Sequence, residues 1–66
     1  MKASELRQYT DDELKKLLED KKRQLMELRF QLSMNQLNNT SLIKQTKRDI
    51  ARIKTILRER ELGIRR

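Results

Sequence analysis

Apolar residues recur at alternating steps of three and four along most of this chain, and this repeat constrains the fold more than any other feature of the sequence. The first stretch is built mainly from leucines, at Leu14, Leu18, Leu25, Leu28 and Leu32. Lys21 takes the one remaining position in this stripe. The spacing places the stripe on one side of an α-helix and is the heptad seam of a coiled coil, continued for about three heptads.

A helix start signal precedes the leucine stripe. Thr10 and Glu13 form the Thr-x-x-Glu pattern of a capping box, in which the two side chains satisfy free N–H groups of the first turn. Asp11 and Asp12 also suit the positive end of the helix dipole. These features predict a first helix over residues 10–37, with one possible short turn over residues 3–7 ahead of it.

A second apolar stripe follows a polar break. Residues 35–41 are rich in Asn and Ser, which favour turns, and Thr40 or Ser41 can cap a new helix. The second helix is expected over residues 40–61, with Gly63 as its stop signal. Its stripe consists of Ile43, Thr46, Ile50, Ile53 and Leu57. The sequence therefore predicts an all-α fold, an antiparallel and coiled-coil-like two-helix hairpin that forms a single domain over residues 1–66.

The absence of cysteine and histidine excludes several classes of function. A structural zinc site and a Ser/His/Asp or Cys/His nucleophile both need these residue types. A hairpin of 66 residues also offers little room for a substrate pocket. We therefore expect no enzyme, no metal site and no cofactor. No apolar run reaches the length of about 18 residues that a membrane span needs, and no secretory signal is present, so the expected location is cytoplasmic.

The positive charge is concentrated in the second half of the chain. The net charge is +7, of which residues 1–10 contribute +1, residues 11–36 contribute 0 and residues 37–66 contribute +6. This asymmetry favours a polyanionic partner, either a nucleic acid or a membrane surface.

The basic residues of the second helix project away from its apolar stripe when the chain is wound at 100° per residue. They are Lys44, Lys47, Arg48, Arg52, Lys54 and Arg58. Lysine and arginine donate charge-assisted hydrogen bonds to phosphate, so this face predicts an RNA-binding surface. The alternative is a solvated charged face, which is disfavoured because only Asp49, Glu59 and Glu61 oppose the basic residues of this segment.

The first helix carries a second apolar patch that the seam leaves uncovered, formed by Met26, Phe30, Met34 and Leu37. Leu17 and Ile56 are further apolar residues off the seam, and a two-helix hairpin has no third layer to cover them. We interpret the patch as a possible docking surface for RNA or a protein neighbour, with local packing around the loop as the alternative.

Three polar residues lie beside this patch and are weaker RNA-binding candidates. Arg29 can reach phosphate, and the amides of Gln31 and Gln36 can donate and accept hydrogen bonds.

Three stretches of the chain carry a resemblance to a known family. They are Lys2-Ala3-Ser4-Glu5-Leu6-Arg7, Leu28-Arg29-Phe30-Gln31 and Lys47-Arg48-Asp49-Ile50-Ala51-Arg52-Ile53-Lys54-Thr55. With them the chain resembles bacterial ribosomal large-subunit protein family twenty-nine over essentially its whole length. One departure is Met34-Asn35, where many relatives have a small residue and glycine.

The resemblance implies a helical hairpin bound to large-subunit ribosomal RNA near the nascent-chain exit. It also implies large-subunit protein twenty-three as a neighbour, with a nascent-chain chaperone or targeting factor docking nearby. Lys47, Arg48, Arg52 and Lys54 match the basic motif of the family, and Arg29, Gln31 and Gln36 match its first-helix and loop motifs. Lys44 and Arg58 rest on the charge projection alone.

The leading hypothesis is therefore a structural, RNA-binding constituent of the large ribosomal subunit that is a monomer when free. A homo-oligomeric coiled-coil interaction module without an RNA role is the alternative, because the heptads favour self-association. A peripheral membrane helix is ranked last, since the apolar stripe of the second helix is needed to close the hairpin.

Overall fold

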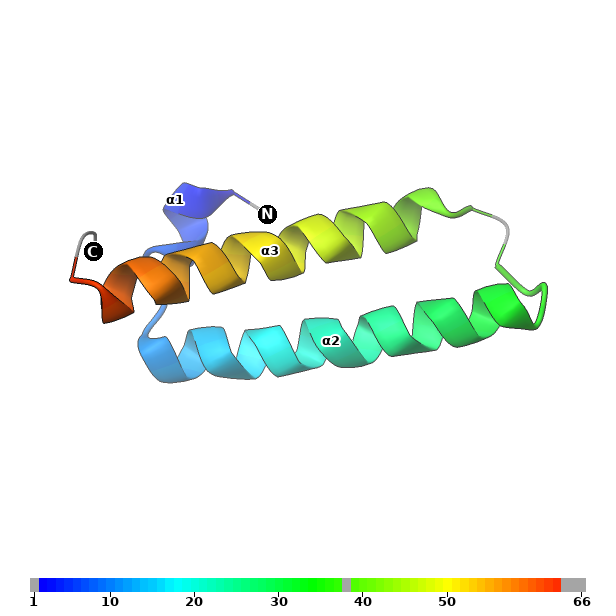
Figure 1. Ribbon diagram of the computed structural model, residues 1–66, viewed down its shortest axis with the longest axis horizontal. Helices are drawn as coiled ribbons and strands as arrows, with labels where there is room; N and C mark the ends of the chain where they lie inside the picture. The colour runs from blue at the N-terminus through cyan, green and yellow to red at the C-terminus, as the bar shows by residue number, and fades with distance from the viewer. Residues whose placement is uncertain (1, 38, 64–66) are drawn as a thin grey trace.

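The computed structural model describes residues 2–37 and 39–63 and contains three helices in this part of the chain (Figure 1). They are α1 (Ala3–Leu6), α2 (Asp11–Ser33) and α3 (Ser41–Glu61). The two long helices run antiparallel, side by side, in a rod of 43 × 17 × 16 Å. The predicted all-α hairpin is confirmed, and so is the short turn ahead of it, which forms α1.

The start of α2 follows its sequence signal. The Glu13 N–H donates to Thr10 Oγ1 at 3.1 Å, and the Thr10 N–H donates to Glu13 Oε1 at 2.8 Å. This reciprocal pair is the predicted capping box. The capping box lies within four consecutive residues, so the sequence predicts it without any tertiary contact.

The end of α2 lies earlier than predicted, at Ser33 rather than at residue 37. Asn35 has a φ of +58°, in the left-handed region that ends helices. Its N–H donates to the Leu32 carbonyl at 3.0 Å, and the Gln36 N–H donates to the Gln31 carbonyl at 2.8 Å. These two bonds form a Schellman motif, which asparagine supports because it tolerates the left-handed conformation better than most residues.

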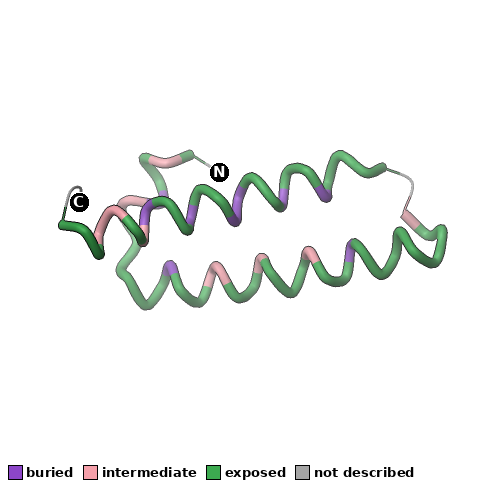
Figure 2. Tube along the Cα trace, viewed as in Figure 1, coloured by how far each residue is buried: buried purple, intermediate pink, exposed green. Residues whose placement is uncertain are grey.

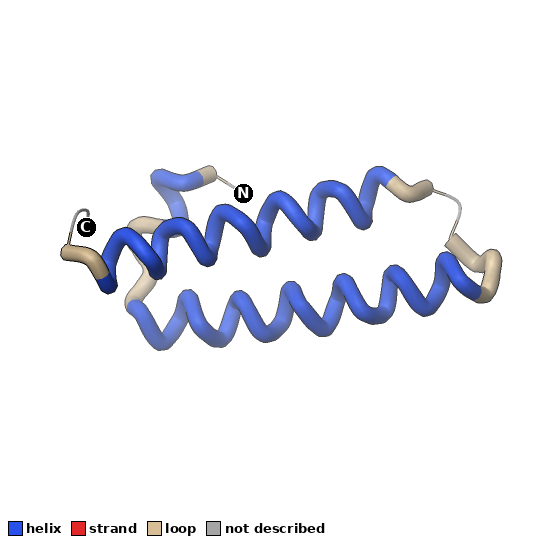
Figure 3. The backbone as a smooth tube through the Cα atoms, viewed as in Figure 1, coloured by secondary structure: helices blue, strands red, loops and turns tan. Residues whose placement is uncertain are grey.

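The start of α3 also differs from its prediction. Thr40 precedes the first helical residue, but its side chain makes no capping hydrogen bond. Instead the Ser41 N–H donates to Asn39 Oδ1 at 2.9 Å, so the side chain that satisfies the first turn comes from Asn39. Asn38, which lies between these turns, is outside the described residues. Figure 3 shows this connection between α2 and α3, with the described loop residues drawn in tan. At the other end, Gly63 takes a φ of +71° and ends α3 as predicted.

Two polar contacts between the long helices show the register of the hairpin. Arg60 Nη1 lies 2.7 Å from Asp11 Oδ1, and Lys21 Nζ lies 3.4 Å from Asp49 Oδ2. With these residues adjacent, the layers of the seam pair Leu18 with Ile53 and Leu28 with Ile43. Figure 2 shows the buried residues of α3 along the side that faces α2.

Leu32 does not belong to the buried seam, although its spacing predicted that it would. It is 41% exposed. In the observed register Leu32 falls opposite residue 39, which precedes Ser41, the first residue of α3. No turn of α3 is therefore present to cover it.

The best-buried cluster lies at the end of the hairpin away from this loop, where α1 packs against α3 (Figure 1). Leu6 of α1 is buried with Leu14, Ile53 and Ile56. Leu17, which is half-buried, packs against the same cluster. The expectation that Leu17 and Ile56 lack a covering layer is therefore wrong, because α1 supplies that layer.

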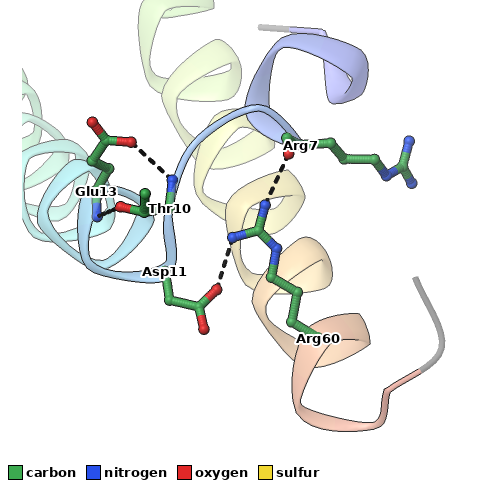
Figure 4. Close-up of polar contacts among 5 residues, drawn as sticks. All are labelled: Arg7, Thr10, Asp11, Glu13 and Arg60. Carbon is green, nitrogen blue, oxygen red and sulfur yellow. Dashed lines mark hydrogen bonds and ion pairs between the residues drawn. The ribbon is translucent and has the colours of Figure 1, made fainter. Parts of the chain in front are cut away.

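A polar clamp holds the same end together (Figure 4). Arg60 donates to Asp11 Oδ1 and, at 3.0 Å, to the backbone carbonyl of Arg7. The Arg7 side chain in turn lies 3.4 Å from Glu59 Oε1. The clamp joins the turn before α2 to the last turns of α3. Both hydrogen bonds of Arg60 in this clamp are made to other residues of the protein.

Among the described residues, a charged pair inside the seam joins Lys21 to Asp49, which is 7% exposed. Gln45 Nε2 also donates to Asp49 Oδ1 at 3.1 Å. Burial on its own would raise the pKa of Asp49, but the hydrogen bonds from Gln45 and Lys21 outweigh it, so the pKa lies below its ordinary value. The lysine in the leucine stripe is thus satisfied by an acid on the facing helix.

Candidate nucleic-acid interface

The six basic residues predicted on α3 are all exposed, and they lie at different places around the helix. Counted at 100° per residue from Ile50 in the seam, Lys54, Lys47, Arg58 and Lys44 lie at about +40°, +60°, +80° and +120°. Arg48 lies at about +160°, on the outermost ridge, and Arg52 lies at about −160°. The structure therefore groups four of the six on one side.

The other side of α3 is occupied by protein. Asp49 and Ile56 are buried, although they lie at about −100° and −120° from Ile50, outside the stripe that the sequence predicted. Ile56 is covered there because α1 packs on this side of α3, and Asp49 lies against Lys21 and Gln45. The surface open to a large partner is accordingly the side of the hairpin opposite α1.

Within the part of the chain that the structure describes, the four grouped side chains have no internal anionic partner. Lys44, Lys47, Lys54 and Arg58 take part in no ion pair among residues 2–37 and 39–63. Arg7 and Arg60 differ, since both are held in the clamp at the base of the hairpin. Cations that no carboxylate neutralises are the ones that can bind phosphate with the full effect of their charge.

The first helix adds Lys15 and Lys22, which the sequence interpretation did not single out, next to Arg29, which it did. Lys15, Lys22 and Arg29 are exposed, and each follows a core position of its heptad, as Lys47 and Lys54 do on α3. In an antiparallel pair these positions lie along the same flank of the seam. We call these five residues the basic flank: Lys15, Lys22, Arg29, Lys47 and Lys54. The heptad positions of these residues can be assigned from the sequence. That the two rows lie side by side follows only from the register of α2 against α3.

The remaining predicted residues lie elsewhere. Counted at 100° per residue, Gln31 lies about 120° from Leu25 of the seam, on the other flank, and Gln36 lies in the loop after α2. With Met26, Glu27 and Phe30 these two amides line a hollow of about 410 Å³ on the outer face of α2. The structure thus separates Arg29, on the basic flank, from the two glutamines with which it was grouped.

The apolar patch is present on the same outer face. Met26, Phe30 and Met34 are 71%, 64% and 53% exposed. Leu37 is half-buried and lies beyond the end of α2, so its predicted place on the helix surface does not apply. The exposed patch therefore consists of three side chains, two of which, Met26 and Phe30, also line the hollow.

The described residues contain neither a carboxylate cluster for a metal ion nor a membrane-spanning helix. Within residues 2–37 and 39–63, no group of three or more carboxylates stands close enough together to hold a metal ion. In the same part of the chain, no helix is both long enough and apolar enough to cross a membrane.

These features define a class: a small basic helical hairpin with an exposed flank suited to a polyanion. The family described as Ribosomal L29 protein matches residues 4–60, and the chain belongs to this family. Two relatives named large ribosomal subunit protein uL29, from Thermotoga petrophila and Thermotoga maritima, are each 88% identical over 66 residues, covering all of both chains. A uL29 protein from Kosmotoga olearia is 71% identical over the same full length.

Proposed function

We propose that this protein is a structural constituent of the large ribosomal subunit and binds ribosomal RNA through the side of the hairpin opposite α1. Family membership supports a structural role in the ribosome of the bacterial cytoplasm and agrees with the expectation that the chain is not an enzyme. The observation that carries the RNA-binding surface is the grouping of Lys44, Lys47, Lys54 and Arg58 on one exposed side of α3.

The geometry suits contacts with an RNA backbone. From Lys44 to Arg58 the row of cations is about 21 Å long, at 1.5 Å per residue. Phosphate contacts of this kind position a protein without reading base sequence, so specificity comes from the shape of the folded RNA. Arg48 and Arg52 lie further around α3, and we propose that they make peripheral contacts with the same RNA. Arg29 lies beside α3 and contributes from α2.

The outer face of α2 is proposed as a second contact surface. Met26, Phe30 and Met34 are exposed near the loop, and Gln31 and Gln36 line the adjacent hollow. An apolar surface rimmed by amides suits a neighbouring component of the subunit better than water. The family resemblance suggests large-subunit protein twenty-three as this neighbour. It also suggests that a chaperone or targeting factor docks nearby, at the nascent-chain exit.

A binding titration over a salt series tests the proposed function. The free protein is titrated with a folded fragment of large-subunit ribosomal RNA and with a nonribosomal RNA of equal length. The ribosomal fragment should bind more tightly at moderate salt, and log K should fall by about 0.7 to 0.9 for each phosphate neutralised per unit of log salt. Equal affinity for both RNAs would refute specific binding to ribosomal RNA.

The alternative of a homo-oligomeric coiled coil has no support from the comparisons, and the heptad stripes that suggested it pack against each other within one chain. The expectation that the free chain is a monomer stays a prediction, which sedimentation at micromolar concentration tests. A stable dimer without affinity for ribosomal RNA would reverse the assignment.

A further inference from the structure

The register of the hairpin places like charges beside each other along one flank of the seam. With Asp11 next to Arg60 and Lys21 next to Asp49, Lys15 lies alongside Lys54 and Lys22 lies alongside Lys47. Arg29 continues the α2 row towards the loop. Both lysine pairs flank the seam at exposed positions, so each pair costs stability in the free protein.

This arrangement departs from what the fold alone would favour. Flanking positions of coiled coils commonly carry opposite charges that pair across the seam. The opposite flank of this hairpin shows no such conflict, because it holds Leu17 with Ile56 under α1, and Asp49 paired with Lys21. Repulsion is therefore confined to the flank that α1 leaves open.

Acidic residues border this flank without forming an ion pair with its lysines among the described residues, although Asp11 and Glu61 line a hollow together with Lys15. Asp12 and Glu19 lie one row further out, and beyond them Lys16 and Arg23 occupy the back of the helix. The α3 side of the flank is instead bordered by Lys44 and Arg58. A polyanion lying along the seam would thus meet two rows of cations, one on each of two helices whose axes usually lie about 8–10 Å apart.

We propose that the basic flank is one phosphate-binding strip built by both helices, in which Lys15, Lys22 and Arg29 of α2 bind the RNA backbone together with Lys47 and Lys54 of α3. This inference rests on the proposed function. It extends the RNA-binding surface to α2, whose basic and acidic residues cancel to zero net charge. The bound phosphates neutralise the paired lysines, so RNA binding relieves the repulsion that the free hairpin carries.

Two double variants test the strip. The first is Lys15→Gln with Lys22→Gln, on the flank, and its matched control is Lys16→Gln with Arg23→Gln, on the back of α2. Both pairs remove two positive charges from the same helix, and glutamine keeps a similar helix propensity. Binding to the ribosomal RNA fragment and thermal unfolding are measured for each, with circular dichroism to confirm equal helix content.

The flank variant should bind about tenfold or more weakly at physiological salt, and its salt slope should fall by about 1.4 to 1.8, since two phosphate contacts are lost. Its Tm should rise by about 2–6 °C, because two like-charge pairs are removed. The control should lose less than about threefold in affinity and gain no stability. A lower RNA affinity combined with a higher Tm in the flank variant shows that the substituted lysines bind RNA, because a variant that folds poorly would lose both affinity and Tm.

Equal loss of affinity in both variants would overturn the proposal, since only overall charge would then matter. An unchanged affinity in the flank variant would overturn it as well. The proposed function is tested separately, with the unsubstituted protein. If that protein binds ribosomal and nonribosomal RNA equally, the proposed function fails, whatever the two variants show.

Discussion

Replacement of Leu6 by alanine tests whether α1 is an integral part of the fold. Leu6 is 1% exposed and belongs to the cluster with Leu14, Ile53 and Ile56. A buried Leu→Ala change costs about 2–5 kcal/mol, and the lower part of this range applies here because a single-turn helix at the edge of a core can partly collapse. We therefore expect a loss of about 2–3 kcal/mol.

For a chain of this size, each 1 kcal/mol shifts Tm by about 4–8 °C, so the Leu6→Ala protein should melt about 10–20 °C lower. Leu42→Ala is the matched control, since Leu42 lies in α3 but is 49% exposed. It should lower Tm by only a few degrees. Thermal unfolding followed by circular dichroism measures both. Equal shifts for the two variants would refute the reasoning, because α1 would then contribute nothing by covering Ile56.

Three other substitutions test local features of the fold. Asp49 has a lower pKa in the folded chain than in the unfolded chain, so its stabilising contribution is present above about pH 4 and is lost as the pH falls through the folded value. Asp49→Asn should therefore flatten the fall of Tm as the pH drops below about 4, and an unchanged profile would exclude this group as its source. Asn35→Gly should stabilise the protein by up to about 1 kcal/mol, since glycine adopts the φ of +58° without strain; a lower midpoint in urea would contradict this. Thr10→Ala should cost about 1 kcal/mol by removing one half of the capping box, and an unchanged urea midpoint would argue against that bond.

Local signals predicted much of the fold. The capping box at Thr10 and Glu13 needs only four consecutive residues, and Gly63 ends α3 by its own conformational freedom. The seam followed from its spacing, including the place of Lys21, although the sequence did not identify Asp49 as its partner. The end of α2 was misplaced because the 3.6-residue pattern continues through Leu37, whereas the left-handed turn at Asn35 stops the helix.

Features that depend on distant parts of the chain were missed. Leu6 reaches Ile56 across fifty residues, and no period within α3 indicates that a third helix covers that side. The basic flank was missed for a related reason. Lys15 and Lys22 belong to a segment of zero net charge, and only the register of α2 against α3 brings them beside Lys54 and Lys47.

Lysine footprinting of assembled large subunits tests the binding surface most directly. The free protein and subunits that contain it are treated with an acetylating reagent, and the modified lysines are identified by mass spectrometry. Protection on assembly is predicted for Lys15, Lys22, Lys44, Lys47 and Lys54. Lys16, on the back of α2, should stay as reactive as in the free protein. Protection of Lys16 together with continued reactivity of Lys47 and Lys54 would contradict binding of ribosomal RNA through the side opposite α1.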